Sequence, residues 1–255
     1  MSKVIIKTPQ EIELMRASGR IAAEILKDLQ EHAKPGVTTM ELNARAIELV
    51  GLRNKQLGGV KVAFKGYEGF PAAACTSLNE IIVHGVPNKV PLKEGDSLGL
   101  DFGVTYKGWY SDTAITIPIG EVSPEVKRII RVCQESLNVG IAKARVGSTT
   151  GDIGAAVQQY VEKEGYGIVR NLCGHGVGKD LHESPEVPNF GKRHEGVKLV
   201  PGMVIAIEPM IVAGSPLLRP AKDGYGYETK DKSLTAHFEH TVAITEKGPE
   251  VLTRI

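Results

Sequence analysis

The sequence predicts an α+β protein in which one antiparallel sheet is flanked by pairs of helices. Apolar residues recur at helical spacing over residues 12–29 and 129–142, and a second helical pattern follows each run. The segments between and after them are rich in β-branched and aromatic residues and are interrupted by glycine turns, which is typical of antiparallel strands. The two helical patterns also resemble each other, which predicts two related halves.

The helical patterns form an internal repeat. Residues 34–50 (KPGVTTMELNARAIELV) match residues 145–161 (RVGSTTGDIGAAVQQYV) at a constant offset of 111. In each copy we predict that a glycine ends one helix and that a threonine pair caps the next, with Glu41 or Asp152 in its first turn.

A second match predicts how the halves meet. Residues 92–103 (LKEGDSLGLDFG) resemble residues 199–210 (LVPGMVIAIEPM) and align Asp101 with Glu208. A pseudo-two-fold axis between the halves would bring these two carboxylates face to face, although such a short pattern could also recur by chance. We predict a single domain over residues 1–255, with halves at roughly 10–118 and 124–245.

Composition excludes several classes of protein. The chain has 255 residues, with 31 basic and 30 acidic side chains and a net charge of +1. No basic stripe stands out, so we expect no specific nucleic-acid partner. Three cysteines and no secretory leader predict a cytoplasmic protein without a disulfide framework. No apolar stretch is long enough to span a bilayer, so no membrane partner is expected.

Five side chains form a candidate metal-binding set. A carboxylate buried alone in an apolar strand is costly, so each needs a partner. Two shared divalent cations would neutralise four carboxylates, and an oxygen-rich set with one imidazole suits Co, Fe, Mn or Zn better than a closed structural zinc site. The sequence therefore predicts a metallohydrolase with two divalent metal ions. The five residues are Asp101, Asp112, His175, Glu208 and Glu239.

The two aspartates lie on opposite arms of a predicted hairpin. Aromatic and β-branched residues run from Asp101 to Asp112 and turn near Lys107-Gly108. Both carboxylates can then point to one face. The alternative is a pair of ordinary strand-edge or turn aspartates, and the two readings have about equal weight without other motifs.

The two glutamates lie at predicted strands. Glu208 ends the apolar run 203–207 and is followed by Pro209, which closes the strand. Glu239 lies in the strand pattern AHFEHTVAI. We expect its histidine neighbours, His237 and His240, to point to the opposite face and to support the site without binding metal.

His175 lies between two glycines and is either a metal ligand or a structural histidine. Its glycines allow close backbone approach, but no Gly-Lys-Ser/Thr follows His175, so a phosphate loop is disfavoured. His84 lies in a similar His-Gly-Val context, and His182 follows seven residues after His175, which favours a functional role for all three.

These motifs together resemble the type I methionine aminopeptidases, which have the pita-bread fold. The resemblance covers nearly the whole chain. It implies a hydrolase that removes the initiator methionine from peptides and nascent proteins when the second residue is small. The motifs are GYEGFPAAACTSLNEIIVHGVP, LDFGVTYKGWYSDTA, CGHGVGKDLHESP, GMVIAIEPM and FEHTVAIT.

The resemblance also implies a role for each site residue. Asp101 would chelate one ion, Asp112 and Glu239 would bridge the two ions, and His175 with Glu208 would complete the other. Three residues would act on the substrate: His182 would hydrogen-bond the oxyanion, Glu208 would carry a proton to the leaving amine, and His84 would orient the scissile amide, unless it is only a hydrogen-bonded loop histidine.

The methionine pocket implied by the resemblance is apolar and aromatic. Leu181, Tyr225 and Phe64 differ from the residues that the family commonly has there, namely phenylalanine, tryptophan and a smaller residue, so the selectivity of the pocket stays open. The implied substrate-binding residues are His84, His182, Phe64, Tyr67, Phe70, Cys75, Leu181 and Tyr225.

Three other classes of protein share this fold. Proline-specific metallopeptidases share the fold and the metal set but carry a further N-terminal domain, and the type II methionine aminopeptidases insert a helical segment between His175 and Glu208, for which there is little space. A non-catalytic pita-bread binding module would have lost metal ligands. We expect a monomer that meets N-terminal methionine peptides and nascent chains at the ribosome.

Overall fold

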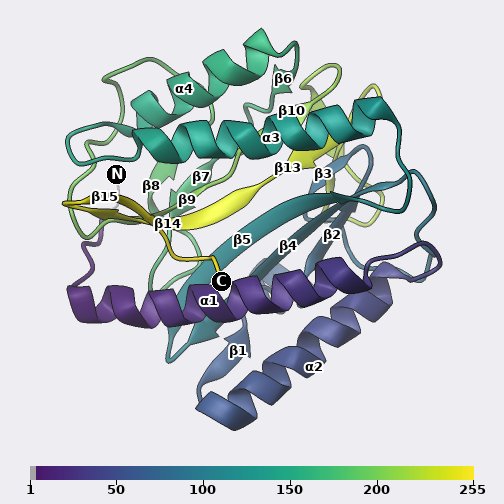
Figure 1. Cartoon of the computed structure of the whole chain (residues 1–255), viewed down its shortest axis with the longest axis horizontal. Helices are drawn as coiled ribbons and strands as arrows, with labels where there is room; N and C mark the ends of the chain where they lie inside the picture. The colour runs from purple at the N-terminus through teal and green to yellow at the C-terminus, as the bar shows by residue number, and fades with distance from the viewer. Residues whose placement is uncertain (1–3) are drawn as a thin grey trace.

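The computed structural model describes residues 4–255 and confirms the predicted arrangement of helices on an antiparallel sheet (Figure 1). The helices are α1 Pro9–His32, α2 Thr39–Leu57, α3 Pro124–Lys143 and α4 Thr150–Lys163, with one 3-10 turn, η1 Tyr67–Gly69. The strands are β1 Val60–Val62, β2 Cys75–Leu78, β3 Ile81–Val83, β4 Ser97–Tyr106, β5 Trp109–Pro118, β6 Gly167–Ile168, β7 Gly174–Gly176, β8 Glu183–Val187, β9 Val204–Ile207, β10 Met210–Val212, β11 Leu218–Pro220, β12 Tyr227–Thr229, β13 Thr235–His237, β14 Glu239–Thr245 and β15 Gly248–Val251.

The predicted threonine caps are confirmed. Thr38 caps α2 and Thr149 caps α4, and each forms a reciprocal capping box with an acidic residue three positions later, Glu41 or Asp152. Such a box satisfies backbone N–H groups that a helix start leaves without an intrahelical partner. The two repeated segments therefore begin their second helices in the same way.

The prediction that a glycine ends the first helix of each half is wrong, because each helix ends before its glycine. The helix α1 ends at His32 and α3 at Lys143. Gly36 and Gly147 lie four residues later, in the turns before the next helices, with φ of +92° and +88°. A left-handed backbone is cheap only for glycine, so these residues serve the turn and not the helix end.

The two halves repeat the same contacts between helix pair and sheet. The N–H of Gly36 donates to Leu92 O at 2.8 Å, and the N–H of Gly147 donates to Leu199 O at 3.0 Å. An isolated β-bridge joins Thr38 to the residue before Leu92, and another joins Thr149 to the residue before Leu199. These pairs follow the offsets of the two sequence matches. The domain limits and the limits of the halves stay predictions.

The central feature of the fold is a nine-stranded sheet. Its spatial order is β1-β4-β5-β14-β9-β7-β8, with β2 paired to β4 and β15 paired to β14. In the view of Figure 1, the helices α1 and α2 lie below the curved strands and the helices α3 and α4 lie above them. Two further sheets have three strands each, in the orders β13-β10-β6 and β11-β12-β3. No helix within residues 4–255 combines the length and apolarity that a membrane crossing requires.

Alternation along β4 separates the core from the site. Leu98, Leu100 and Phe102 are fully buried in the apolar cluster that includes residues of α1 and α2. Because successive side chains point to opposite faces, Asp101 and Gly103 lie on the other face. A Cβ at Gly103 would come 2.8 Å from the Phe64 ring, so the glycine leaves room for that ring. The core therefore lies beneath the helices, and the opposite face is free for chemistry.

Candidate metal centre

Five adjacent strands each bring one of the predicted ligands to the middle of the sheet. The order across the sheet is β4, β5, β14, β9 and β7. The residues that these strands supply, in the same order, are Asp101, Asp112, Glu239, Glu208 directly after β9, and His175.

The strand register places three of these carboxylates on one face. Asp101 and Glu239 both lie directly opposite Ala114 of β5, one on each side. Asp112 lies two positions before Ala114 in the same strand, and residues two apart share a face. The predicted hairpin is confirmed, with Lys107 and Gly108 at φ of 51° and 78° in its turn.

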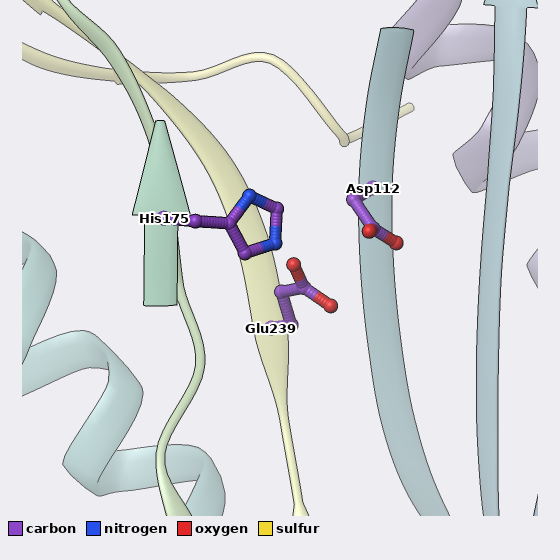
Figure 2. Close-up of side chains that lie close together, drawn as sticks. All are labelled: Asp112, His175 and Glu239. Carbon is purple, nitrogen blue, oxygen red and sulfur yellow. The ribbon is translucent and has the colours of Figure 1, made fainter. Parts of the chain in front are cut away.

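The side chains converge as well as the strands. One ligand atom each of Asp112, His175 and Glu239 lies within 4.8 Å of the others. Figure 2 shows the Glu239 carboxylate close to the His175 ring, with the Asp112 carboxylate across from them. Glu208 Oε1 lies 3.5 Å from His175 Nε2, and Asp101 lines the same cavity as the other four side chains. All five predicted side chains therefore belong to one cluster.

The cluster holds more negative charge than its surroundings satisfy. Burial, then the neighbouring carboxylates, raise the pKa of Asp101 and Glu239, and the same causes raise that of Asp112. Burial raises the pKa of Glu208 to about 8. One buried oxygen each of Asp101, Asp112 and Glu239 has no hydrogen-bond partner. Buried oxygens usually have partners, so this donor set fits divalent cations.

Hydroxyl and amide side chains fix the backbone beside the ligands. Thr241 Oγ1 donates to Asp112 O at 2.7 Å and accepts from the N–H of Asp112 at 2.9 Å. Thr113 Oγ1 donates to Glu239 O, and Asn189 Nδ2 donates to Glu208 O at 2.8 Å. The threonine bonds join β5 to β14, and the asparagine bond joins the segment after β8 to the residue after β9.

His175 is held as a neutral imidazole with one free nitrogen. Burial, followed by the charge of His182, lowers its pKa to about 3. Its Nδ1 lies 2.9 Å from Gly176 O, which leaves Nε2 facing the carboxylates. A ring N–H bonded to a carbonyl typically orients a metal-binding histidine. A Cβ at Gly174 would lie 2.3 Å from Ala206 O, so the flanking glycine is needed for close strand packing.

The predicted orientation of the histidines beside Glu239 is wrong for His237. Its Nε2 lies 3.5 Å from Glu208 Oε2 and has no hydrogen-bond partner. His240 instead pairs its Nδ1 with Thr253 Oγ1 at 2.9 Å. His237 precedes Glu239 by two positions, and this spacing should have indicated a shared face.

Two cavities meet at the cluster and form the cleft. One has a volume of about 470 Å³ and is lined by Asn171, Cys173 and Glu186, among others. The second has a volume of about 440 Å³. His84 and His182 line both cavities, so they stand where the cavities join.

The second cavity contains the whole predicted methionine pocket. Tyr225 packs edge-on against Phe70 with ring centroids 5.5 Å apart, and its hydroxyl donates to Gly69 O at 2.7 Å. The lining residues that the sequence predicted are Phe64, Tyr67, Phe70, Cys75, Leu181 and Tyr225.

His182 is oriented by two rings. Tyr67 OH lies 2.7 Å from its Nδ1, and the His175 ring packs edge-on at 4.2 Å between centroids. Loss of hydration lowers the pKa of His182 and also that of His84, although His84 as a whole residue is exposed. His84 itself has a left-handed φ of 59°, a strained backbone that often marks a functional position.

Comparison with known proteins defines the class first. The sequence profile of Metallopeptidase family M24 matches residues 13–246. The match covers most of the chain, which therefore belongs to this family of metal-dependent hydrolases.

The relatives then define the branch. The chain is 46% identical over 251 residues to a methionine aminopeptidase of Clostridium acetobutylicum, with 98% of each protein covered. It superimposes on the crystal structure of methionine aminopeptidase from Rickettsia prowazekii with a TM-score of 0.95 at 40% identity, covering 98% of this chain and 100% of that one. The predicted resemblance to the type I methionine aminopeptidases is thus confirmed.

A more distant comparison supports the fold alone. The prolidase from Pyrococcus horikoshii matches with a TM-score of 0.77 at 24% identity, covering 98% of this chain and 63% of that chain. The pita-bread fold predicted from the sequence is confirmed by these neighbours.

Proposed function

We propose that this chain removes the N-terminal methionine of peptides and nascent proteins, with a preference for a small second residue, by hydrolysing the first peptide bond. One observation carries the proposal. A buried cluster of four carboxylates and an imidazole, with three carboxylate oxygens lacking a partner, opens directly onto an apolar aromatic cavity. The names of the relatives support the same activity.

The five residues of the cluster would hold two divalent ions of Co, Fe, Mn or Zn. Asp112 and Glu239 lie between the other ligands and would bridge the ions, Asp101 would complete one site, and His175 with Glu208 the other. Four carboxylates balance the four charges of two such ions. When bound, the ions supply an acidified water and polarise the scissile carbonyl.

The histidines act on the substrate amide. Tyr67 OH lies 2.7 Å from His182 Nδ1, and when the tyrosine hydroxyl donates this hydrogen bond the neutral ring carries its proton on Nε2. That N–H would donate to the oxygen of the carbonyl as negative charge develops. His84, which lines both cavities as His182 does, would orient the amide.

Glu208 would move the proton. Its carboxylate stands between His175 Nε2 and His237 Nε2, each 3.5 Å away, and burial raises its pKa to about 8. With cations bound beside it, this carboxyl group would be ionised and could accept a proton from water and pass it to the leaving amine.

The aromatic cavity would select methionine. Phe64, Tyr67, Phe70, Leu181 and Tyr225 offer apolar faces to a flexible thioether, and sulfur–aromatic contacts are favourable. Burial raises the pKa of Cys75 well above its ordinary value, so this residue presents a neutral thiol to the same cavity.

Cellular setting is part of the proposal. We infer a cytoplasmic monomer that meets nascent chains at the ribosome, without a specific nucleic-acid or membrane partner. Sedimentation of the purified chain and its cofractionation with translating ribosomes would test the oligomeric state and the encounter.

Hydrolysis of a matched pair of peptides tests the reaction. The metal-free protein is incubated with Met-Ala-Ser and with an Xaa-Pro peptide, with and without added Mn or Co, and released residues are measured by chromatography. We expect methionine release that depends on added metal. Preferential cleavage before proline would favour a proline-specific peptidase, and no cleavage with any metal would favour a binding module.

A further inference from the structure

A lysine near the start of the described chain is buried beside the cleft. Lys7 is 4% exposed, and its Nζ lies 2.7 Å from Glu183 Oε2. The Nζ also donates to Ile5 O at 3.2 Å, and the backbone N–H of Lys7 donates to Gly202 O at 2.8 Å. Charged side chains are seldom buried unless paired, so this ion pair joins the N-terminal segment to β8.

The other oxygen of the same carboxylate closes a loop. Glu183 Oε1 accepts from the N–H of Lys179 at 2.7 Å and from the N–H of Asp180 at 3.3 Å. Glu183 also begins β8, where it lies opposite Gly176 of β7. The segment 177–182 between the two strands is therefore tied back onto its own end by one carboxylate.

Packing around this carboxylate leaves no free space. A Cβ at Gly178 would lie 2.3 Å from Glu183 Oε1 and 2.7 Å from Lys7 Cε. The N–H of Gly178 donates to Asp180 O at 3.1 Å, and its carbonyl accepts from the N–H of Tyr110. The N-terminal segment, the loop and the β4–β5 hairpin therefore meet at one point.

The loop ends in two residues of the candidate site. Leu181 lines the aromatic cavity and His182 lines both cavities, and His182 directly precedes Glu183 in the chain. A shift of the Glu183 carboxylate would move the backbone that carries both side chains. Catalytic groups are sensitive to such shifts, and a misplacement of 1 Å can cost about 10²-fold in rate.

We propose that Lys7 is a positioning residue for His182 and Leu181. Its ammonium group fixes the Glu183 carboxylate in the orientation that holds the loop, and so sets the geometry of a site assembled from residues far along the chain. This inference rests on the proposed function, because the effect of the ion pair is read out as methionine release.

The first test replaces the charge with an apolar side chain of similar length. Lys7→Met should lower kcat for Met-Ala-Ser by about 10²-fold. KM should change less, because the aromatic cavity keeps its other walls. Bound metal, measured by atomic emission after dialysis against Mn, should equal that of the wild type, because the loop carries none of the five proposed ligands.

A matched control separates loop positioning from general loss of an ion pair. Arg16 also lies in the N-terminal part of the chain and forms a bidentate pair with Glu250, which belongs to β15 and not to the loop. Arg16→Met should leave kcat and KM as in the wild type. Equal losses of kcat in the two variants would overturn the inference, because a general loss of stability would then account for both.

A second variant guards against misfolding. Lys7→Met leaves a buried carboxylate without its partner, which can unfold a protein. The double variant Lys7→Met/Glu183→Gln removes both charges and keeps an oxygen for the loop amides. We expect the double variant to fold. Its kcat should lie between those of the wild type and of Lys7→Met. If Lys7→Met does not fold, the kcat of the double variant should still be lower than that of the wild type.

The outcomes distinguish the inference from the function beneath it. Wild-type kcat in folded Lys7→Met or in the folded double variant would overturn the positioning role and leave the proposed function intact. A wild type that releases no methionine with any metal would overturn both.

Discussion

Asp101 and Glu208 occupy matching positions in the two repeated segments, but they stand on different backbones. Asp101 lies inside the ten-residue strand β4 and is opposite Cys75 on one side and Ala114 on the other. Glu208 follows the end of β9 and precedes Pro209, outside any strand, with a histidine Nε2 3.5 Å from each carboxylate oxygen.

This difference in backbone suits the two residues to different roles in the metal centre, namely ion binding and proton exchange. A short side chain on a backbone that is hydrogen-bonded on both sides is held still, which suits a residue that only binds an ion. A longer side chain at a strand break can adjust while it exchanges a proton. The repeat therefore supplies two acidic groups at equivalent places, and the local backbone decides what each can do.

The largest effect should come from Glu208→Gln. The amide keeps the shape and one donor oxygen but cannot accept and release a proton, so kcat should fall by about 10²–10⁴-fold, the usual contribution of a general acid or base. Stopped-flow or chromatographic assays of methionine release would measure it, and circular dichroism would check the fold. Unchanged turnover would remove Glu208 from the proton-transfer role.

Asp101→Asn should act on metal binding. Mutation of a residue that only supports a metal ligand typically lowers metal affinity by about 10–100-fold. Removal of a ligand's own charge should weaken the binding of one ion by more than this. Calorimetric titration with Mn would show a weakened second binding event. If Asp101→Asn bound metal as the wild type does and Glu208→Gln lost both ions, the assignment of ion binding to Asp101 and proton transfer to Glu208 would be contradicted.

Much of this geometry could be predicted because short-range rules govern it. The Lys107-Gly108 turn, the Thr38 and Thr149 caps, and the end of β9 before Pro209 all follow from local conformational preferences. The set of five metal-binding candidates could be read from single acidic residues in apolar strands, because burying each alone is costly.

What could not be predicted depends on distant contacts. The hydrogen bond between Tyr67 and His182 and the ion pair between Lys7 and Glu183 join residues far apart in the chain. No local pattern specifies them. The wrong prediction for His237 has a different cause, because its spacing of two positions from Glu239 is local information that favours a shared face.

Stability of the metal-free protein should fall as the pH rises. Burial raises the pKa of Glu208 from 4.5 to about 8, and the pKa values of Asp101, Asp112 and Glu239 are also raised. The folded state therefore holds protons that the unfolded chain releases, and this stabilisation is lost as the pH rises toward 8.

The effect of these carboxyl groups on stability can be measured from pH 6.5 upward. Below it, His175 and His237, whose pKa values burial lowers to about 3, have the opposite effect, because the unfolded chain then gains protons. Between pH 6.5 and pH 8.5, Tm by calorimetry in the presence of a chelator should fall by more than about 2–4 °C. Added Mn should abolish the fall, and a Tm that rises with pH in the chelated protein would contradict the account.

The smallest effect concerns the matched helix caps. Thr38→Ala and Thr149→Ala each remove the hydroxyl of a capping box, which should cost about 1 kcal/mol of the free energy of unfolding in either half. Denaturant titration would measure both. Similar losses with unchanged kcat would sharpen the view that the halves share a scaffold and differ at the site, whereas a loss of kcat from either cap would contradict it.

Anomalous X-ray scattering from crystals grown with Mn offers the most direct test of the central claim. The account predicts two peaks within the cluster, one beside Asp101 and the other beside His175 and Glu208, with Asp112 and Glu239 between them. Peaks only at other places in the molecule, or none in a crystal of protein that releases methionine, would contradict it.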